Sequence, residues 1–318
     1  MATADQRGAE TTVDLTVAIC TLDRSESLRQ TLRTLATQSW GGSWDILIVD
    51  NGGGTASGQE ACAAVRGLPV DLRVTVEARR GLSFARNRAL AEARGDAIIF
   101  IDDDVNCLPG WLAAHGDALR DPAVAGIGGR ILPVLPESAP ECFRLLYTQK
   151  HGGPASRYDF GDEPRQITPG GRVKPPFGAN MALRRALALS LGGFRTDLGW
   201  GERMLPGEET ELFRRILAAG GRVLYVPAAA VEHRIEPTRV TFGYYARWWR
   251  GYGRASVRLN PPRGPVQRMT MVGQLCWGVA REARRLRRAR RRRDVVRELG
   301  ALQKRSQSEG GLLELLGL

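Results

Sequence analysis

The sequence predicts an α/β fold in which one mostly parallel sheet is flanked by helices and followed by a helical extension. Over the first 130 residues, short segments rich in branched apolar residues alternate with longer segments of helical pattern. Strands that alternate with helices form β-α-β units, so their strands run parallel. After Pro237 the pattern is helical. With 318 residues and 43% hydrophobic side chains, the chain can bury a sizeable core.

The expected elements follow one another along the first part of the chain. Strands rich in β-branched residues are predicted at 15–20, 45–50, 72–78, 97–102 and 124–132. The helices between them are predicted from Ser25, a candidate N-cap, and over 81–95 and 109–121. Ligands of such sheets bind beyond the carboxyl ends of the strands. Residues at those ends are therefore the first place to look for chemistry.

The second part of the chain is less regular. Residues 133–180 are rich in Pro and Gly and predict long loops over the site. A strand over 177–185, a helix over 208–219 and a strand over 222–227 are expected next. One final helix is expected to carry an apolar face formed by Leu275, Val279, Ala283, Leu286, Ala289, Val296, Leu299 and Leu302. The predicted organisation is a flexible N-terminus (1–14), an α/β domain (15–237) and a helical, arginine-rich extension (238–318).

The positive charge of the chain is concentrated near its C-terminal end. The formal net charge is +12, and residues 281–305 alone have twelve basic side chains against three acidic ones. The rest of the chain is therefore close to neutral and is not a basic nucleic-acid platform. The basic segment is a separate feature, suited to an anionic membrane surface, to nonspecific nucleic-acid binding or to a solvated helix face.

Cysteine usage and the N-terminus indicate a reducing compartment. The five cysteines are scattered and show no C-x-x-C spacing, which argues against a disulfide framework or a zinc site. Residues 1–14 are polar and have no apolar signal-peptide region. The most apolar stretch, 271–280, is about half the length of a membrane span. A cytoplasmic location is expected.

Three adjacent carboxylates follow the apolar strand "AIIFID". Asp102, Asp103 and Asp104 repel one another, so their grouping at a strand end needs a reason. They can form a solvated end to the strand, or hold a divalent cation such as Mg²⁺ or Mn²⁺ together with a nucleotide diphosphate. A calcium loop is excluded because Cys107 and Ala113 stand where glycine and glutamate are required. The stretch "GIGGRI" lacks the third glycine of a dinucleotide fingerprint, and no Walker motif occurs.

Five motifs in order resemble the family-2 glycosyltransferases, inverting nucleotide-sugar enzymes of the GT-A fold. They are "AICTLDR", "DILIVDNGG", "GLSFARNRALAEARGDAIIFIDDDV", "FGANMALRR" and "GEETEL", and the resemblance covers residues 15 to 235. It implies a GT-A type fold with a single Rossmann-like sheet. It also implies transfer of a sugar from a nucleotide diphosphate, most readily a UDP or dTDP sugar, to an acceptor hydroxyl. The alternative is a non-catalytic nucleotide-sugar, membrane or nucleic-acid binder that has kept the fold.

The resemblance implies roles for residues near the nucleotide and the metal. Nucleotide-binding positions are implied for Thr21, Asp23, Asp50, Arg86, Asn87 and Asp103. Asp50 would accept a hydrogen bond from the base, or form an Asx turn, or do both. Arg86 would counter the charge of the diphosphate. Asp104 would bind the metal ion, Mg²⁺ or Mn²⁺, with His233 as a further metal ligand; an ordinary surface histidine is the alternative for His233.

The resemblance also implies an acceptor side. An inverting transfer needs a carboxylate that takes the proton of the attacking hydroxyl, and "GEETEL" places Glu209 where the family usually has aspartate. The positions implied beside the donor sugar and the acceptor are Asp102, Gly178, Ala179, Asn180, Trp200 and Glu208. Trp200 would stack on an acceptor or belong to the core.

The resemblance narrows the partners. Many members of the family act on lipid-linked acceptors, which favours an anionic membrane surface as the partner of residues 271–305 and peripheral attachment at the cytoplasmic face. Nucleic acid is disfavoured. The acceptor is left open among a glycan, a glycolipid and a natural product, and no sequence feature identifies the sugar.

Overall fold

The computed structural model describes residues 14–52, 70–149, 152–201 and 203–318. Apart from Asp14, the predicted flexible N-terminus lies outside these residues. The strands of the central sheet are β1 (Leu15–Thr21), β2 (Trp44–Asp50), β3 (Asp71–Val76), β4 (Ala97–Asp102), β5 (Val105–Cys107), β6 (Val124–Val134), β7 (Arg165–Ile167), β8 (Asn180–Arg184) and β11 (Arg222–Arg234). A separate ribbon pairs β9 (Gly199–Trp200) with β10 (Met204–Leu205).

The sheet has a parallel half, as the alternating pattern predicts. Its strand order is β3-β2-β1-β4-β8-β6-β11-β5, with β7 paired to β11. The first four strands pair in parallel, and so do β6 and β11. Strand β8 runs antiparallel between β4 and β6. The carboxyl ends of β1, β2 and β4 therefore meet at one edge, which brings Thr21, Asp50 and Asp102 to the same side of the molecule.

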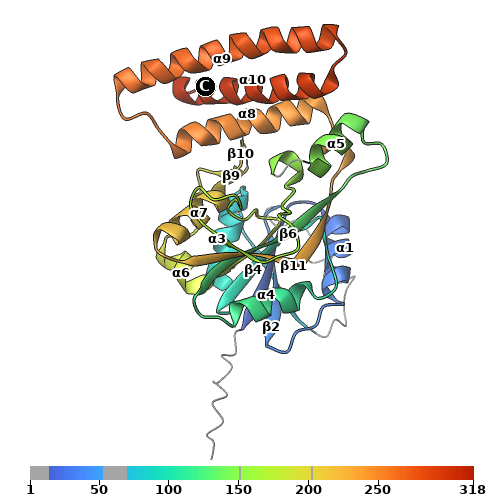
Figure 1. Cartoon of the computed structure of the whole chain (residues 1–318). Helices are drawn as coiled ribbons and strands as arrows, with labels where there is room; N and C mark the ends of the chain where they lie inside the picture. Colours follow the sequence, from blue (N-terminus) through green and yellow to red (C-terminus); the bar gives the residue numbers. More distant parts are fainter. Residues whose placement is uncertain (1–13, 53–69, 150–151, 202) are drawn as a thin grey trace, which may run out of the picture.

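Helices cover both faces of this sheet (Figure 1). They are α1 (Ser25–Leu35), α3 (Leu82–Glu92), α4 (Trp111–Leu119), α6 (Arg185–Ser190) and α7 (Glu208–Ala218), whereas α5 (Glu141–Gln149) packs with the C-terminal helices. The strands β1, β2 and β4 are buried along almost their whole length, because both faces of the parallel half are covered. Side chains such as Val17, Ile48 and Ile99 form the centre of the core together with Phe213 of α7.

Several elements differ from the sequence-based expectation. Residues 133–180 are not all loops, because they contain α5, a 3₁₀ turn (Gly153–Ala155) and β7. Strand β5 was not expected, and β11 extends to Arg234 instead of ending near 227. A register shift between Val226 and Ala230 lets β11 continue past the irregularity and pair with β5. Ser25 is the first residue of α1 and not its cap, since Arg24 holds that position.

The C-terminal extension is a layer of three long helices. They are α8 (Phe242–Leu259), α9 (Pro265–Arg291) and α10 (Val295–Leu316). Helix α10 lies between the other two, and α8 lies nearest the α/β domain (Figure 1). Helices α8 and α10 approach closely: a Cβ on Gly310 would lie within 2 Å of the carbonyl oxygen of Arg250, and one on Gly253 would lie 2.0 Å from that of Gln307. Glycine is required at both positions.

The single final helix predicted from the apolar pattern is wrong. The chain breaks near Arg293, whose φ is 55°, and Asp294 caps α10 by accepting a hydrogen bond from the backbone N–H of Arg297. The predicted apolar face is divided between α9 and α10, and Leu286, Ala289 and Leu299 are buried within the layer. Val296, by contrast, is exposed. None of the helices in the described ranges is both long enough and apolar enough to cross a bilayer.

Candidate active site

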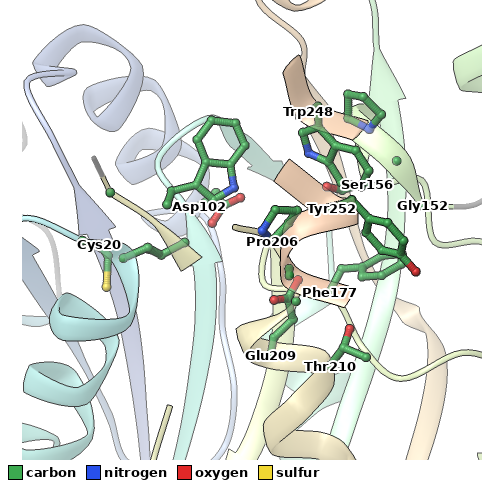
Figure 2. Close-up of a pocket in the computed structure, with 18 of the residues that line it drawn as sticks. Cys20, Asp102, Gly152, Ser156, Phe177, Pro206, Glu209, Thr210, Trp248 and Tyr252 are labelled. Atoms are coloured by element: carbon green, nitrogen blue, oxygen red, sulfur yellow. The ribbon is translucent and has the colours of Figure 1, made fainter. Parts of the chain in front are cut away.

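A cavity of about 680 Å³ opens above the carboxyl ends of β1 and β4. Its walls come from the ends of these strands, from the segment 152–177, from the start of α7 and from α8. Figure 2 shows Asp102, Glu209, Phe177, Trp248 and Tyr252 around this space. Segments that are far apart in the sequence therefore share one cavity, which is the candidate active site.

The three acids occupy the turn between β4 and β5. Asp103 and Asp104 are buried, whereas Asp102 is partly exposed. The hydroxyl of Thr21 donates to Oδ2 of Asp103 at 2.7 Å, and the hydroxyl of Thr31 donates to the Asp103 carbonyl oxygen at 2.9 Å. Burial raises the pKa of Asp103 to about 7, although the adjacent Arg24 opposes this shift. The acids are thus held by the fold and are not a solvated strand end.

Asp102, Asp104 and His233 form a group able to hold a metal ion. Each offers one ligand atom, and these atoms lie within 4.8 Å of one another. His233 is placed here because β11 pairs with β5, which sets His233 opposite Val105. Its Nδ1 lies 3.1 Å from the Ala155 carbonyl oxygen, which leaves Nε2 3.3 Å from Oδ1 of Asp104. Two carboxylates and one oriented imidazole fit a divalent cation.

Two arginines lie against the same acids, and sequence reasoning missed both. The guanidinium group of Arg24 contacts Asp103 at 2.5 Å, Asp104 at 3.0 Å and Glu236 at 2.5 Å. That of Arg239 lies 3.3 Å from Asp104. Burial raises the pKa of Asp104, but the charges of His233, Arg239 and Arg24 outweigh it, so this pKa lies well below its usual range. Arg24 directly follows Asp23 in the motif "AICTLDR", and its place in this motif could have identified it as a site residue.

Glu209 is the second residue of α7, and it lines the cavity. Its Oε2 atom is buried and has no hydrogen-bond partner among the described residues. Burial, assisted by the neighbouring Glu208 carboxylate, raises the pKa of Glu209 to about 8. A carboxylate with one unpartnered oxygen on the wall of a cavity has the properties of a general base that can take a proton from a substrate.

Glu208 and Arg86 do not face the cavity as expected. Arg86 Nη1 contacts Oε1 of Glu208 at 2.6 Å, both side chains are buried, and neither lines the cavity. Arg86 also lies 3.7 Å from Asp102. Gly178 makes room for this pair, since a Cβ there would overlap the guanidinium group. The pair therefore connects α3, α7 and β4 outside the cavity wall.

Three further predicted site residues are structural. The side-chain amide of Asn87 bonds the backbone of Phe194 in both directions, at 2.8 Å each. Asn180 is fully buried: its Oδ1 lies near Trp111 and His115, and its Nδ2 donates to the carbonyl oxygens of Arg130 and Ala229. Neither amide is free to bind a sugar hydroxyl. Ala179 is likewise buried and outside the cavity wall.

The residues predicted for the nucleoside have mixed positions. Thr21 lines the cavity. Asp50 is buried and its Oδ1 accepts from the backbone N–H of Gly52 at 2.8 Å, the expected Asx turn. Asp23 is exposed with a φ of 54° and does not line the cavity. Asn51, which was not among the predicted site residues, does line it.

Trp200 stands on the cavity wall beside aromatic residues of α8. Its ring stacks on Tyr244 at a centroid distance of 6.4 Å, and Arg239 lies 5.9 Å from its ring. Trp248, Trp249 and Tyr252 continue this wall along α8. The sequence predicted helix in this region but did not connect it with the site.

Comparisons with known proteins agree with this geometry. The family model described as glycosyl transferase family 2 matches residues 16–187, which is more than half of the chain. The chain is 25% identical over 264 residues to the glucosyl-dolichyl phosphate glucuronosyltransferase of Haloferax volcanii, covering 78% of this chain and 79% of the relative. It is 28% identical to the pre-mycofactocin glycosyltransferase of Mycobacterium tuberculosis, covering 69% of this chain but only 42% of the relative. The succinoglycan biosynthesis protein ExoM of Rhizobium meliloti is 27% identical, with 74% and 72% covered.

Solved structures share the fold. The mannosyltransferase PcManGT from Pyrobaculum calidifontis, in complex with GDP-Man and Mn²⁺, has a TM-score of 0.54 at 19% identity and covers 81% of this chain and 67% of its own. GalNAc-T7 with UDP, GalNAc and Mn²⁺ has a TM-score of 0.56 at 17% identity, with 78% and 48% covered. The GT-A fold expected from the motifs is confirmed. Sequence motifs, family match and fold agree, and the chain belongs to glycosyl transferase family 2.

Proposed function

We propose that this protein transfers a sugar from a nucleotide diphosphate donor, with UDP or dTDP as the carrier, to an acceptor hydroxyl with inversion at the anomeric carbon. One observation carries the proposal: the group Asp102, Asp104 and His233 and the unpaired carboxylate of Glu209 face a single cavity. The first group suits a divalent cation, and the second suits proton removal. A metal-assisted inverting transfer uses both functions in one site.

The proposed division of labour follows from the charges around the cavity. When bound to Asp102, Asp104 and His233, Mg²⁺ or Mn²⁺ would neutralise charge on the leaving diphosphate. Arg24 and Arg239 carry positive charge on the same wall and can bind phosphate oxygens. Thr21, Asn51 and Asp50 lie towards the end of β1 and β2, where the nucleoside would bind.

Glu209 supplies the chemical step on the acceptor side. Its free Oε2 accepts the proton of the acceptor hydroxyl while that oxygen bonds to the anomeric carbon and the bond to the diphosphate oxygen breaks. A single displacement of this kind inverts the anomeric configuration. The family usually has aspartate at this position, and the glutamate side chain is longer by one methylene group. Because Glu209 lies in the first turn of α7, its side chain reaches the cavity.

Calorimetric titration of UDP, dTDP and GDP, each with and without Mn²⁺, tests the donor site. Wild type should bind one nucleotide in a metal-dependent manner, and Asp104→Ala should lose this binding. Asp162→Ala provides a matched control, because Asp162 is an exposed acid outside the cavity. Failure of all three nucleotides to bind wild type in the presence of Mn²⁺ contradicts the proposal.

A non-catalytic binder with the same fold is the rival function. The two differ in one property: an enzyme slowly hydrolyses its donor sugar nucleotide in the presence of metal, and a binder does not. The unpaired oxygen of Glu209 favours the enzyme, because a protein that only binds has no need for a buried carboxylate oxygen left without a partner.

We also propose peripheral attachment to an anionic membrane, at the cytoplasmic face, through the outward face of α9. The apolar residues that the sequence placed on one helix face are divided between α9 and α10, and Leu286, Ala289 and Leu299 are buried within the helical layer, so a different face carries the proposal. Val266, Met269 and Trp277 are 77%, 75% and 62% exposed. At 100° per residue they share one side of α9 with the exposed residues Arg284, Arg287, Arg288 and Arg291.

The charges of this outward face support an anionic partner. No ion pair is found for these four arginines within the described residues, and the sole acid of α9, Glu282, is buried against Arg281 and Arg285. A face with apolar residues at one end and unpaired arginines at the other suits insertion among lipid headgroups. It suits nucleic acid less well, since nucleic acid does not require the exposed apolar half.

A further inference from the structure

The cavity has a second half, remote from the acids, whose wall is mainly apolar. This half is formed by α8 and by the segment that runs from the 3₁₀ turn at Gly153 to Phe177. Its apolar members are Pro154, Pro175, Phe177, Trp248, Trp249, Tyr252 and Leu259. In Figure 2, Phe177, Trp248 and Tyr252 stand across the space from Asp102, with Glu209 between the two halves. We call this set of residues the aromatic wall.

The rings of the aromatic wall are held against one another. Trp248 and Tyr252, one helical turn apart on α8, stack with their planes 13° apart and their centroids at 5.8 Å. Trp249 meets Trp248 edge-on at 4.6 Å and Tyr252 at 5.3 Å. Opposite them, Phe177 packs on Tyr158 at 5.3 Å. These rings are fixed by their neighbours, so the wall keeps its shape without a ligand.

Packing of the protein does not account for the whole wall. Trp248 is nearly buried, but Tyr252 remains 43% exposed at the cavity. The long polar side chains of this half, Lys174, Arg214 and Asn260, are exposed, whereas Pro154, Trp248 and Ala255 farther in are buried. The other polar groups of this half are the short hydroxyls of Ser156 and Thr210, which are partly buried, and of Ser256, which is exposed. The aromatic and proline surfaces between these groups suit an apolar group, which gains by leaving water against them.

We infer that the aromatic wall is the acceptor subsite, and that the acceptor carries an apolar ring or chain next to its reacting hydroxyl. This inference rests on the proposed function, because it places the reacting hydroxyl at Glu209. From there the remainder of the acceptor extends along α8 towards the exposed side chains of Lys174 and Arg214. The shared chemistry is an apolar aglycone, which an aromatic natural product or a prenyl-type lipid can both supply.

Three glycosides that differ only in their aglycone test the inference. Methyl, phenyl and octyl β-D-glucopyranoside are titrated by calorimetry into wild type saturated with Mn²⁺ and with the nucleotide that binds. We expect phenyl or octyl glucoside, or both, to bind at least about tenfold more tightly than methyl glucoside. Preference for phenyl identifies an aromatic acceptor, and preference for octyl identifies a lipid chain; either result supports the inference.

Substitutions in the aromatic wall test whether it causes the preference for apolar glucosides. Tyr252→Ala should reduce the advantage of the apolar glucoside about tenfold, while Tyr252→Phe keeps the ring and should retain it. Trp277→Ala is the matched control, since it removes an exposed aromatic from the outward face of α9. Nucleotide affinity should be unchanged in all three, so that a failure of the donor site is recognised separately. Equal binding of the three glucosides, binding of none, or an unchanged preference in Tyr252→Ala overturns the inference.

Discussion

Arg24 places one guanidinium group against three carboxylates from two separate parts of the chain. Asp103 and Asp104 follow β4, and Glu236 follows β11. Two buried adjacent carboxylates would be costly without a counter-charge, and Arg24 supplies it. The same positive charge opposes a metal cation at Asp104. Metal ion and nucleotide should therefore bind best together, because the diphosphate offers Arg24 an alternative anionic partner.

The substitution Arg24→Gln tests this competition. We expect the affinity for Mn²⁺ alone to rise, on the order of tenfold, because a positive charge about 3 Å from Asp104 is removed. The affinity for the nucleotide should fall in the same variant. Titration calorimetry measures both, and Arg29→Gln is the control because Arg29 pairs with Glu26 on the surface of α1, away from Asp104. An unchanged or weaker affinity for Mn²⁺ in Arg24→Gln would show that Arg24 does not compete with the metal.

Glu209 predicts a pH dependence of the transfer. Burial raises its pKa to about 8, so below that pH the carboxyl is mostly protonated and cannot accept a proton. The value of kcat/KM should therefore rise with pH and level off above about 8. Glu209→Gln should lower kcat by about 10² to 10⁴ and abolish this limb of the profile, with nucleotide affinity unchanged. A profile that is flat from pH 6 to 9 in wild type would remove Glu209 from the role of base.

At the scale of residues, the sequence motifs indicate which segments surround the cavity, but they do not indicate which side chains point into it. The acids after β4, Glu209 on α7 and His233 on β11 all line one cavity. Asn180 and Arg86 do not, because a motif gives the position of a residue along the chain and not the direction of its side chain. Whether a polar group faces a cavity or a buried partner depends on neighbours distant in sequence, here Trp111 for Asn180 and Glu208 for Arg86.

At the scale of elements, local pattern was sufficient where both faces of a strand are buried. Strands β1, β2 and β4 are continuous apolar runs and were predicted nearly to their ends. Strands β5 and β7 have three residues each, and both form by hydrogen bonding to β11. Their own sequences contain no pattern that predicts this pairing. The break between α9 and α10 was missed because the apolar pattern continues across Arg293, where only the backbone turns.

The close approach of α8 and α10 makes a prediction about stability. Gly310→Val should destabilise the fold by about 1–3 kcal/mol or more, because its side chain would overlap the Arg250 carbonyl and force the helices apart. Gly273→Ala on α9 is the matched control: no atom lies within 4 Å of its added Cβ, so stability should stay equal or rise slightly. Urea unfolding followed by circular dichroism measures both. Equal stability of Gly310→Val and wild type would show that the two helices are not held this closely.

At the scale of the whole molecule, α9 is the outer layer of the C-terminal helices (Figure 1). If its outward face binds membranes, the protein should sediment with phosphatidylglycerol vesicles and not with phosphatidylcholine vesicles, and salt should release it. Arg284→Gln and Arg288→Gln should each weaken binding about fivefold, since each arginine near the surface contributes about 1 kcal/mol. Arg254→Gln is the control, because Arg254 pairs with Glu314 inside the layer. Binding to RNA but not to vesicles would reject the membrane as the partner.

The position of α10 between α8 and α9 has a consequence for how the protein is made. A ribosome synthesises α8 and α9 before α10, yet each of these helices packs chiefly on α10. During translation both helices must therefore keep apolar surface in water until residue 316 has left the exit tunnel. The α/β domain, whose strands are all complete by Arg234, is free to fold well before then. The newborn chain thus passes through a stage with a finished sheet and an unassembled helical layer, and during that stage it is most exposed to aggregation and most dependent on chaperones.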